Sequence, residues 1–491
     1  MKLYNVLKNS SFYTFATALQ GMVSFFLLPI YTRYLSPKDY AILALVTSFV
    51  GIISSIITFQ IHTGIPRFVN KFFKDTDRAK IYFSNIFILL FAVLLFGCIV
   101  INIFGERIIK ILFSDKNGIA YSPFFLIATW TLLPTLLIGC GMTLLQTLEK
   151  GSKFFLVTLI QVVANVSFGL FFVVFLKTGP IGVLWAQLIS AACGLIFITW
   201  MIRDWLGFML PKFSKDISNS LRYSLPIIPH ILSIYIYMYS DRLILQRFVP
   251  LSEIGIYSIA DTFACILLII VNATTTAYNF RFLRIGVEDR SKAQEERRKF
   301  IEIWWFGIMV IFMGYLLLSN YVVKLMTQPS FYPSIALIPI LAIAYIFRGL
   351  YCFGANNLFF LEKTKFIPVI TITAAIINVV LNLIFIPKFG IFAAAWTTVV
   401  SYFITFLLAY IFSQKYLPGT YPWKNILKVI SLALLVYMGA KIFDRMIPLG
   451  ALYKFSFNIM MVMLFGALTA FTLYREYSIK AVRVVVNFFK A

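Results

Sequence analysis

Residues 221–256 have the sequence LRYSLPIIPHILSIYIYMYSDRLILQRFVPLSEIGI, a long apolar run that contains the adjacent charges of Asp241 and Arg242. The length of the run predicts a membrane-spanning helix, which needs about 20 apolar residues. A charged side chain at the centre of such a helix costs about 2.5–3.5 kcal/mol on insertion scales. We therefore expect Asp241 and Arg242 to have partners or a function. The same stretch also begins a second copy of the first half of the chain.

The composition of the whole chain indicates a membrane protein. The chain has 491 residues, of which 61% are hydrophobic and only 13% are charged, whereas soluble domains contain about 25% charged residues. The net charge of +24 does not indicate nucleic-acid binding, because most Lys and Arg residues fall in short connections between apolar runs. That distribution is typical of the charge bias that orients membrane proteins. We predict an all-α integral membrane protein that binds no nucleic acid.

Cysteine and histidine are too few and too scattered for a metal centre. The five cysteines lie far apart in apolar runs, without Cys-x-x-Cys spacing, and there are only two histidines, His62 and His230. Disulfides, metal clusters and a zinc site are therefore not expected. The sequence also has no Gly-rich phosphate loop of the Walker type, which argues against ATP hydrolysis. We predict no bound cofactor, with H⁺, Na⁺ or the membrane potential as candidate energy sources.

Fourteen apolar runs are long enough to span a membrane as helices. The first run lacks a cleavage site and should remain as an anchor, and the Lys and Arg bias places both termini in the cytoplasm. The basic connections at 67–80 and 280–299 are expected to be cytoplasmic loops. Pro226 and Pro229 are expected to bend the seventh run. The runs are 10–32, 39–62, 82–104, 123–148, 154–176, 181–201, 222–247, 254–279, 301–323, 334–360, 366–386, 390–412, 425–443 and 453–474.

The two halves of the chain share a repeated pattern, and three pairs of segments carry it. TRYLSPKDYAILAL (32–45) resembles QRFVPLSEIGIYSI (246–259), LEKGSKF (148–154) resembles LEKTKF (361–366), and GPIGVLWAQLIS (179–190) resembles GIFAAAWTTVVS (390–401). Each copy holds six helices, so both copies share one orientation and are related by an axis along the membrane normal.

The repeat predicts how the chain is divided. We expect an N-terminal lobe at 1–201, a cytoplasmic linker at 202–221 and a C-terminal lobe at 222–412. The segment 413–491 would add two helices and a cytoplasmic amphipathic tail. The part of the linker that reads DWLGFMLPKF (204–213) mixes aromatic, apolar and basic residues, which is typical of a short helix in the membrane interface.

Arg348 is the residue that most strongly indicates a binding site. It lies about halfway along the run 334–360, and an arginine near the bilayer midplane is a functional-site hypothesis by default. Its planar guanidinium suits two-point contact with phosphate. The alternative is a structural arginine that bonds to carbonyls or to an acid on a neighbouring helix.

The seventh run contains further candidates. Tyr235, Tyr239 and Arg242 lie on one helical face, which suits stacking on sugar rings beside an anion; the alternative is that the tyrosines serve packing or lie at the interface. Asp261, in the next run, has a similar depth to Arg242. These two residues either form an ion pair that only holds two helices together, or they and Asp241 face a cavity and contribute to coupling.

Two arginines near the cytoplasmic side are candidates for substrate entry. Arg67 and Arg281 occupy matching positions in the two copies. The alternative is that they set topology or anchor helix ends at the interface. Asn378 and Asn382 either line a wet cavity or bond across helices.

At this point the chain resembles a known family. The segments LKNSSFYTFATALQGMVSFFLLPIYTRYLSPKDYAILAL (7–45) and SDRLILQRFVPLSEIGIYSIAD (240–261), with the LEK and GPIGVLWA segments, look like polysaccharide repeat-unit flippases of the Wzx type. These belong with the lipid II flippases and the multidrug and toxin extrusion transporters. The resemblance implies two six-helix lobes, alternating access, and a polyprenyl-diphosphate-linked oligosaccharide carried across the bacterial cytoplasmic (inner) membrane. It also implies a cationic central cavity that holds the diphosphate.

The resemblance has one departure. Lipid II flippases place key arginines in their first helix, whereas the run 10–32 contains no charge. This disfavours lipid II as substrate and leaves Arg242 and Arg348 as the candidates for diphosphate binding. The last two helices would contact the lipid tail, and a polysaccharide polymerase complex is a candidate partner. The rival functions are a multidrug or toxin cation antiporter, for which the first run supplies no acid, and a membrane enzyme such as a polymerase.

Overall fold

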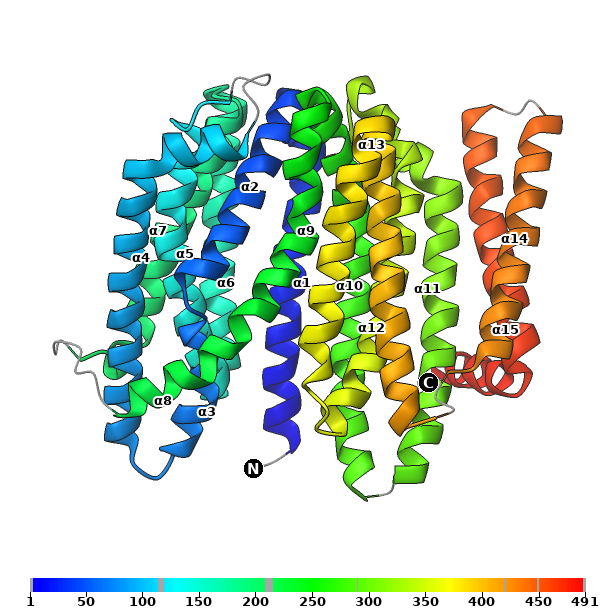
Figure 1. Cartoon of the computed structure of the whole chain (residues 1–491). Helices are drawn as coiled ribbons and strands as arrows, with labels where there is room; N and C mark the ends of the chain where they lie inside the picture. The colour runs from blue at the N-terminus through cyan, green and yellow to red at the C-terminus, as the bar shows by residue number, and fades with distance from the viewer. Residues whose placement is uncertain are drawn as a thin grey trace. The chain divides into compact units, whose positions relative to one another are not determined.

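The computed structural model describes residues 3–113, 119–207, 215–288, 290–418, 421–447 and 450–488. Within these ranges the chain is helical and no strand occurs (Figure 1). The all-α prediction is therefore confirmed. The apolar runs form helices because backbone groups in lipid must find their hydrogen-bond partners inside the same segment.

The described residues of the first half form nine helical segments. A capping box starts α2, in which the Ser36 hydroxyl accepts from the Asp39 N–H while Asp39 accepts from the Ser36 N–H. Asp75 caps α4 in the same way, by accepting from the Arg78 N–H. The segments are α1 (Leu3–Tyr34), α2 (Pro37–Ile57), η1 (Ile61–Gly64), α3 (Ile65–Lys71), α4 (Thr76–Leu112), α5 (Phe124–Thr147), α6 (Gly151–Leu170) with its π-turn η3 (Phe171–Phe175), and α7 (Pro180–Met201).

The second half begins with a short turn and helix and continues with long helices. Within it α13 is interrupted at Gly390, whose φ of 56° and ψ of −136° are not helical. The segments are η4 (Arg203–Trp205), α8 (Lys215–Ser224), η5 (Leu225–Ile227), α9 (Ile228–Phe248), α10 (Leu251–Glu288), α11 (Arg290–Met326), η6 (Pro329–Ala336), α12 (Ile338–Phe360), α13 (Phe366–Tyr416), α14 (Trp423–Met446) and α15 (Ala451–Phe488).

Eleven of the helices in the described residues are long and apolar enough to cross a membrane. Each of the fourteen predicted runs lies largely in a helix, and α13 contains two of them, separated at Gly390. α1 and α9 are not among the eleven, so the count of fourteen stays a prediction. The outward side chains fit a lipid environment, since Phe96, Ile196 and Leu435 are 70%, 71% and 68% exposed.

One sequence prediction about boundaries was wrong, and another agrees with the structure. The α-helix is interrupted within the run 222–247 where its prolines lie, since α8 ends at Ser224, Pro226 lies in η5, and Pro229 lies in the first turn of α9. Proline is tolerated in a first helical turn because no helical hydrogen bond is lost there. The predicted loop 280–299 is mostly helical, since α10 extends to Glu288 and α11 begins at Arg290.

By its internal contacts the chain forms two compact units. Unit 1 comprises Met1–Ile259 with Thr371–Thr397, and unit 2 comprises Ala260–Ile370 with Thr398–Ala491. Unit 1 therefore contains α9 and the middle of α13 as well as the N-terminal helices. The lobe boundaries predicted from the repeat stay a prediction.

Unit 1 is held together by helix packing around a large apolar core. α7 packs on α5 and α6, α6 packs on α1, and α2 packs on α9. Fully buried aromatic and aliphatic side chains such as Phe83, Ile86 and Leu90 line the inner face of α4. The predicted interfacial helix at 204–213 falls largely on residues outside the described ranges.

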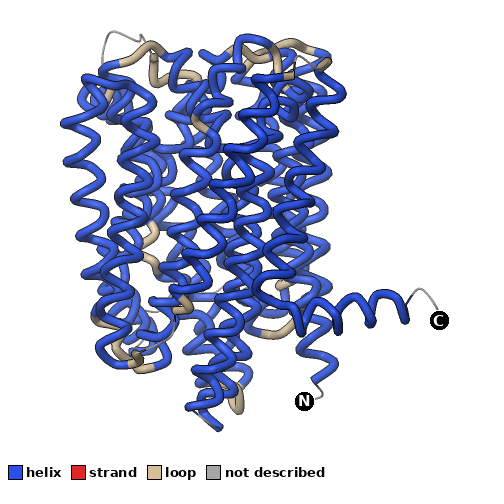
Figure 2. Tube along the Cα trace, turned by 90° about the vertical axis from the view of Figure 1, so that its right-hand side faces the viewer, coloured by secondary structure: helices blue, strands red, loops and turns tan. Residues whose placement is uncertain are grey.

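In unit 2, α11 packs on α12, α14 and α15. A tight aromatic cluster joins α13 to the start of α14, with the Tyr421 ring 5.2 Å from Tyr410 and 5.9 Å from Trp423 between centroids. Figure 2 shows that the last part of α15 turns away from the direction of its first part.

Candidate functional site

An acid–tyrosine contact lies in the middle of unit 2. Asp261 comes from α10, and its Oδ1 accepts a hydrogen bond of 2.5 Å from the Tyr345 hydroxyl on α12. The Cys265 Sγ, one turn along α10, lies 3.3 Å from the same hydroxyl. Tyr345 is buried. A phenol that donates to a carboxylate stabilises the charged acid inside the helix bundle.

The same tyrosine leads to the arginine that sequence analysis singled out. The Tyr345 ring lies 6.1 Å from the Tyr402 ring of α13, and the guanidinium of Arg348 lies 5.9 Å from the centroid of Tyr402. Arg348 is close to the middle of α12 and is half-buried. Its attraction to the π-face of Tyr402 stabilises the cation.

These contacts define the candidate site of unit 2: Asp261, Tyr345, Tyr402 and Arg348. Asp261 is linked to Arg348 by three successive contacts: a hydrogen bond to Tyr345, a ring contact from Tyr345 to Tyr402, and the cation–π contact of Tyr402 with Arg348. Sequence analysis found Asp261 and Arg348 but missed both tyrosines. The arrangement combines a half-exposed cation with an acid that is held in place. The site suits an anionic ligand better than a cationic one, because the Asp261 carboxylate already accepts a hydrogen bond from Tyr345.

In unit 1, Asp241 and Arg242 form a compact buried cluster with Tyr257. Asp241 Oδ1 accepts from the backbone N–H of Arg242 at 2.7 Å and lies 3.4 Å from Arg242 Nη1. The Tyr257 hydroxyl of α10 donates to Asp241 Oδ2 at 2.5 Å, and the Arg242 guanidinium lies 5.4 Å from its ring centroid. Asp241 is 4% and Arg242 is 8% exposed. The pair that sequence analysis noticed is therefore an internal ion pair, and diphosphate binding by Arg242 stays a prediction.

A polar seam joins α9 to the part of α13 that belongs to unit 1. His230 Nδ1 lies 2.9 Å from the Thr371 hydroxyl, and the Ser240 hydroxyl donates to Asn378 Oδ1 at 3.1 Å. Asn382 donates to the same Asn378 oxygen. Asn378 and Asn382 thus take part in a hydrogen-bonded network between helices, which is the second of the two alternatives that the sequence left open.

Tyr235 and Tyr239 share one face of α9, as their spacing predicts. Their rings are stacked with centroids 6.0 Å apart and planes 22° apart. Both lie against Gly51 of α2, where an added Cβ would come within 2.6 Å of Tyr239. The pair therefore packs between helices, and both side chains remain half-exposed.

The structure describes the side chain of only one of the two arginines that were predicted to take part in substrate entry. Arg67, in α3, stacks its guanidinium 4.7 Å from the Tyr223 ring of α8. Arg281 lies in α10, but its side chain is outside the described part of the structure. An entry role stays a prediction for both residues.

α8 is fastened to α4 by two contacts that the sequence did not reveal. Arg78 pairs with Asp216 through bonds of 2.9–3.1 Å, and the buried hydroxyls of Tyr82 and Ser220 lie 2.8 Å apart. Burial of Tyr82 raises the energetic value of its bond, because an unsatisfied hydroxyl there would be costly.

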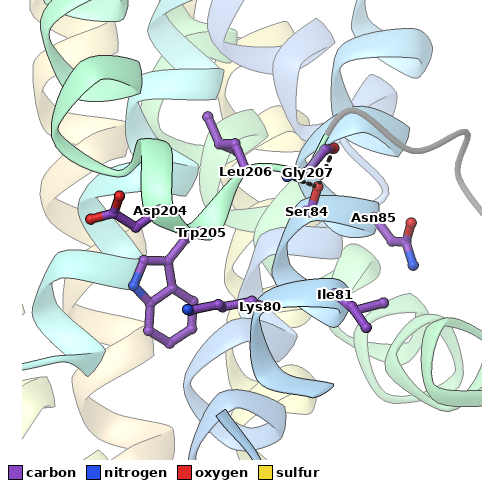
Figure 3. A pocket seen from close by; sticks show the side chains of 8 residues that line it. All are labelled: Lys80, Ile81, Ser84, Asn85, Asp204, Trp205, Leu206 and Gly207. Atoms are coloured by element: carbon purple, nitrogen blue, oxygen red, sulfur yellow. Dashed lines mark hydrogen bonds between the residues drawn. The ribbon is translucent and has the colours of Figure 1, made fainter. Parts of the chain in front are cut away.

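A small pocket of about 160 Å³ lies beside these contacts, at the start of α4 and the end of α7 (Figure 3). The Ser84 hydroxyl closes one side, because it donates to the Gly207 carbonyl and accepts from the Gly207 N–H, both at 2.9 Å. Lys80, Asp204 and Trp205 line the pocket, and Figure 3 shows the Lys80 side chain directed toward the Trp205 ring. With one cation and one acid, the pocket is not a dedicated anion site.

The chain resembles known proteins in sequence and in fold. The family model described as "Polysaccharide biosynthesis protein" matches residues 6–280. No curated protein is similar enough in sequence to count as a match.

Solved structures share the fold at low identity. The lipid II flippase MurJ, in an inward closed conformation, has a TM-score of 0.76 at 17% identity, over 96% of this chain and 99% of that one. An inward-facing multidrug resistance transporter of the MATE family, in the MOP superfamily, has a TM-score of 0.66 at 15% identity, over 80% and 94%. A MOP superfamily transporter from Pyrococcus furiosus has a TM-score of 0.57 at 16% identity, over 84% and 95%. The chain thus has the fold of membrane flippases and transporters.

Proposed function

Because the chain belongs to the polysaccharide biosynthesis protein family, as the match to residues 6–280 establishes, we propose that it is a flippase for polyprenyl-diphosphate-linked oligosaccharides. The lipid would remain in the bilayer while the sugar head group crosses by alternating access between two lobes. The location would be the bacterial cytoplasmic membrane, with both termini in the cytoplasm.

The fold supports a lipid-linked substrate over a small cation. The similarity to the lipid II flippase extends over 96% of this chain, whereas the similarity to the inward-facing multidrug transporter extends over 80%. The longer match favours a substrate that needs helices beyond those of a drug exporter. We assign α14 and α15 to contact with the lipid tail.

The observation that carries the proposal is the placement of Arg348. A guanidinium near the middle of α12, half-exposed and in contact with the Tyr402 ring, marks a functional site by default in a membrane-spanning helix. A diphosphate supplies two negatively charged groups in a geometry that the guanidinium can bind through paired hydrogen bonds. Arg348 is therefore the first-choice diphosphate ligand, with Arg242 as a second candidate.

Surface-glycan export in a strain that lacks the protein tests this function. Wild-type protein should restore the glycan and abolish the accumulation of lipid-linked repeat units. Arg348→Ala should abolish export, and Arg348→Lys should restore it only in part, because an ammonium cannot form the forked contact. Lys110→Ala, which removes an exposed cation from the last turn of α4, is the control for expression and should behave as wild type. Normal export by Arg348→Ala at equal expression contradicts the assignment.

Two further measurements separate the rival functions. A multidrug antiporter would confer efflux of cationic dyes, and a flippase would not. A polymerase would leave single repeat units at the cell surface when it is deleted, whereas loss of a flippase leaves them on the cytoplasmic face. Dissipating the H⁺ gradient, the Na⁺ gradient and the membrane potential in turn would identify the energy source, and copurification would test a polymerase partner.

A further inference from the structure

An open cleft lined by uncharged side chains lies in unit 1, on helices other than those that carry Arg242 and Arg348. Its volume is about 330 Å³, near the lower end of the range of about 300–1,000 Å³ for small-molecule sites. Residues of four helices line it, namely α2, α5, α6 and α7. Its polar lining consists of Thr47, Thr131, Thr135, Gln161, Gln187 and Ser190.

The polar side chains lie deep in the membrane-spanning part of the bundle. Thr47 is the middle residue of α2, Thr135 lies at the middle of α5, and Gln161 lies near the middle of the span formed by α6 and η3. Polar groups at that depth are costly unless they have partners. That four helices direct such groups at one cleft therefore needs an explanation.

Two glutamines line the cleft with side-chain amides that a ligand can reach. Gln187 is exposed and Gln161 is half-buried, and among the described residues neither side-chain amide has a hydrogen-bond partner within the protein. The Gln161 stem packs on α7, where an added Cβ on Gly194 would lie 2.7 Å from its Cγ. The Thr47 and Thr131 hydroxyls donate to carbonyls of their own helices at 2.8 Å, so their oxygens remain available as acceptors.

The chemistry of this lining selects the class of ligand. None of the described residues that line the cleft is charged, so a diphosphate or a cation would lack a counter-charge there. Primary amides offer two donors and an acceptor each, and hydroxyls offer both roles. Adjacent hydroxyl groups on an uncharged ring match such a set.

We propose that this cleft is a binding site for an uncharged sugar ring of the transported head group. The inference rests on the proposed function, and it assigns sugar recognition to α2, α5, α6 and α7 of unit 1, separately from diphosphate recognition by Arg348. Gln161 and Gln187 are the specificity-determining residues of the site.

Affinity measurements with two lipid probes test the proposal. The purified full-length protein is titrated with polyprenyl diphosphate alone and with the lipid-linked repeat unit extracted from cells that lack the protein. Wild-type protein should bind the sugar-bearing lipid more tightly. The Gln161→Leu/Gln187→Leu variant should lose about tenfold in affinity per amide for that lipid, while its Kd for the bare carrier stays unchanged. The control Gln146→Leu, which removes an exposed amide of α5 outside the cleft, should match wild type.

The outcomes separate this inference from the proposed function. If wild-type protein binds neither probe, the flippase proposal fails, and the inference fails with it. If it binds both probes equally, or if the double variant keeps its preference, the cleft inference is overturned and the flippase proposal stands. Replacing unpartnered amides by Leu should not impair folding in a membrane. If the double variant does fail to fold, Thr135→Val is used instead, and retention of the full preference by that variant overturns the inference.

Discussion

Gly179 and Gly390 adopt nearly the same backbone conformation, with φ/ψ of 66°/−145° at Gly179 and 56°/−136° at Gly390. They are equivalent positions of the sequence repeat, each at the start of a matching segment. Glu149 and Glu362, in the two LEK segments, also share a positive φ, of 55° and 57°. The repeat read from the sequence therefore extends to unusual backbone geometry, which hydropathy alone cannot produce.

The two glycines should be intolerant of a side chain. Their conformation is nearly exclusive to glycine, so Gly179→Ala and Gly390→Ala should each lower the free energy of unfolding by roughly 1–3 kcal/mol. The cause is backbone strain, because an added Cβ meets nothing within 4 Å at Gly179 and only ordinary contacts at Gly390. Thermal unfolding in detergent measures the effect. Gly139→Ala, in a helical and open position, should be neutral or slightly stabilising, and an equal loss there would exclude the strain explanation.

The Asp241–Arg242 pair should act mainly on stability. Removing one partner of a buried pair leaves an uncompensated charge, so Asp241→Asn or Arg242→Met should each cost about 3–5 kcal/mol. The variant that combines both substitutions should lose clearly less stability than the sum of the two single losses, because neither charge is left unpaired. A double-mutant cycle on unfolding temperatures measures the coupling. If Arg242→Met kept full stability but abolished glycan export, Arg242 would be a substrate ligand instead.

The bond from Tyr345 to Asp261 should be stronger than an ordinary tyrosine bond. Hydrogen bonds to charged groups contribute about 1.5–3 kcal/mol, against about 0.5–1.5 for neutral pairs. Tyr345→Phe should therefore destabilise the protein more than Tyr315→Phe, whose hydroxyl donates to the neutral carbonyl of Phe263 at 2.8 Å. Unfolding temperatures of the two variants give the comparison. Equal losses would mean that the bond from Tyr345 to Asp261 is no stronger than a bond between neutral groups.

Docking of α8 on α4 should depend more on the buried hydrogen bond between Tyr82 and Ser220 than on the exposed ion pair of Arg78 with Asp216. Arg78 is 54% exposed in its side chain, and such pairs contribute only about 0.2–1 kcal/mol. Tyr82→Phe, which leaves the buried Ser220 hydroxyl without its partner, should cost about 1–3 kcal/mol. Limited proteolysis near residue 215 would report undocking: Tyr82→Phe should speed cleavage, whereas Arg78→Ala or high salt should change it little. If Arg78→Ala or high salt increased the cleavage rate more than Tyr82→Phe, the ion pair would be the main contact that docks α8.

Some of the site was predictable from sequence because the signal is local. Arg348 and Asp261 stand out as charges in apolar runs, and a charge in lipid is rare enough to notice. Tyr345 and Tyr402 do not stand out, since the chain has 26 tyrosines and only their positions on α12 and α13 distinguish these two. Gln161 was missed for the same reason, because one glutamine in an apolar run has no meaning until Gln187 is found beside the same cleft.

The sequence by itself determined the membrane class, the helical fold and the internal repeat, because hydropathy, helix length and proline or glycine positions act over a few turns of one segment. Only the tertiary structure decided which polar groups meet. It paired Arg242 with Asp241 and Tyr257, joined Asp261 to Tyr345, and gathered uncharged side chains from four helices around one cleft. The physical reason is that the cost of a polar group in a membrane depends on its neighbours in space, and those come from distant parts of the chain.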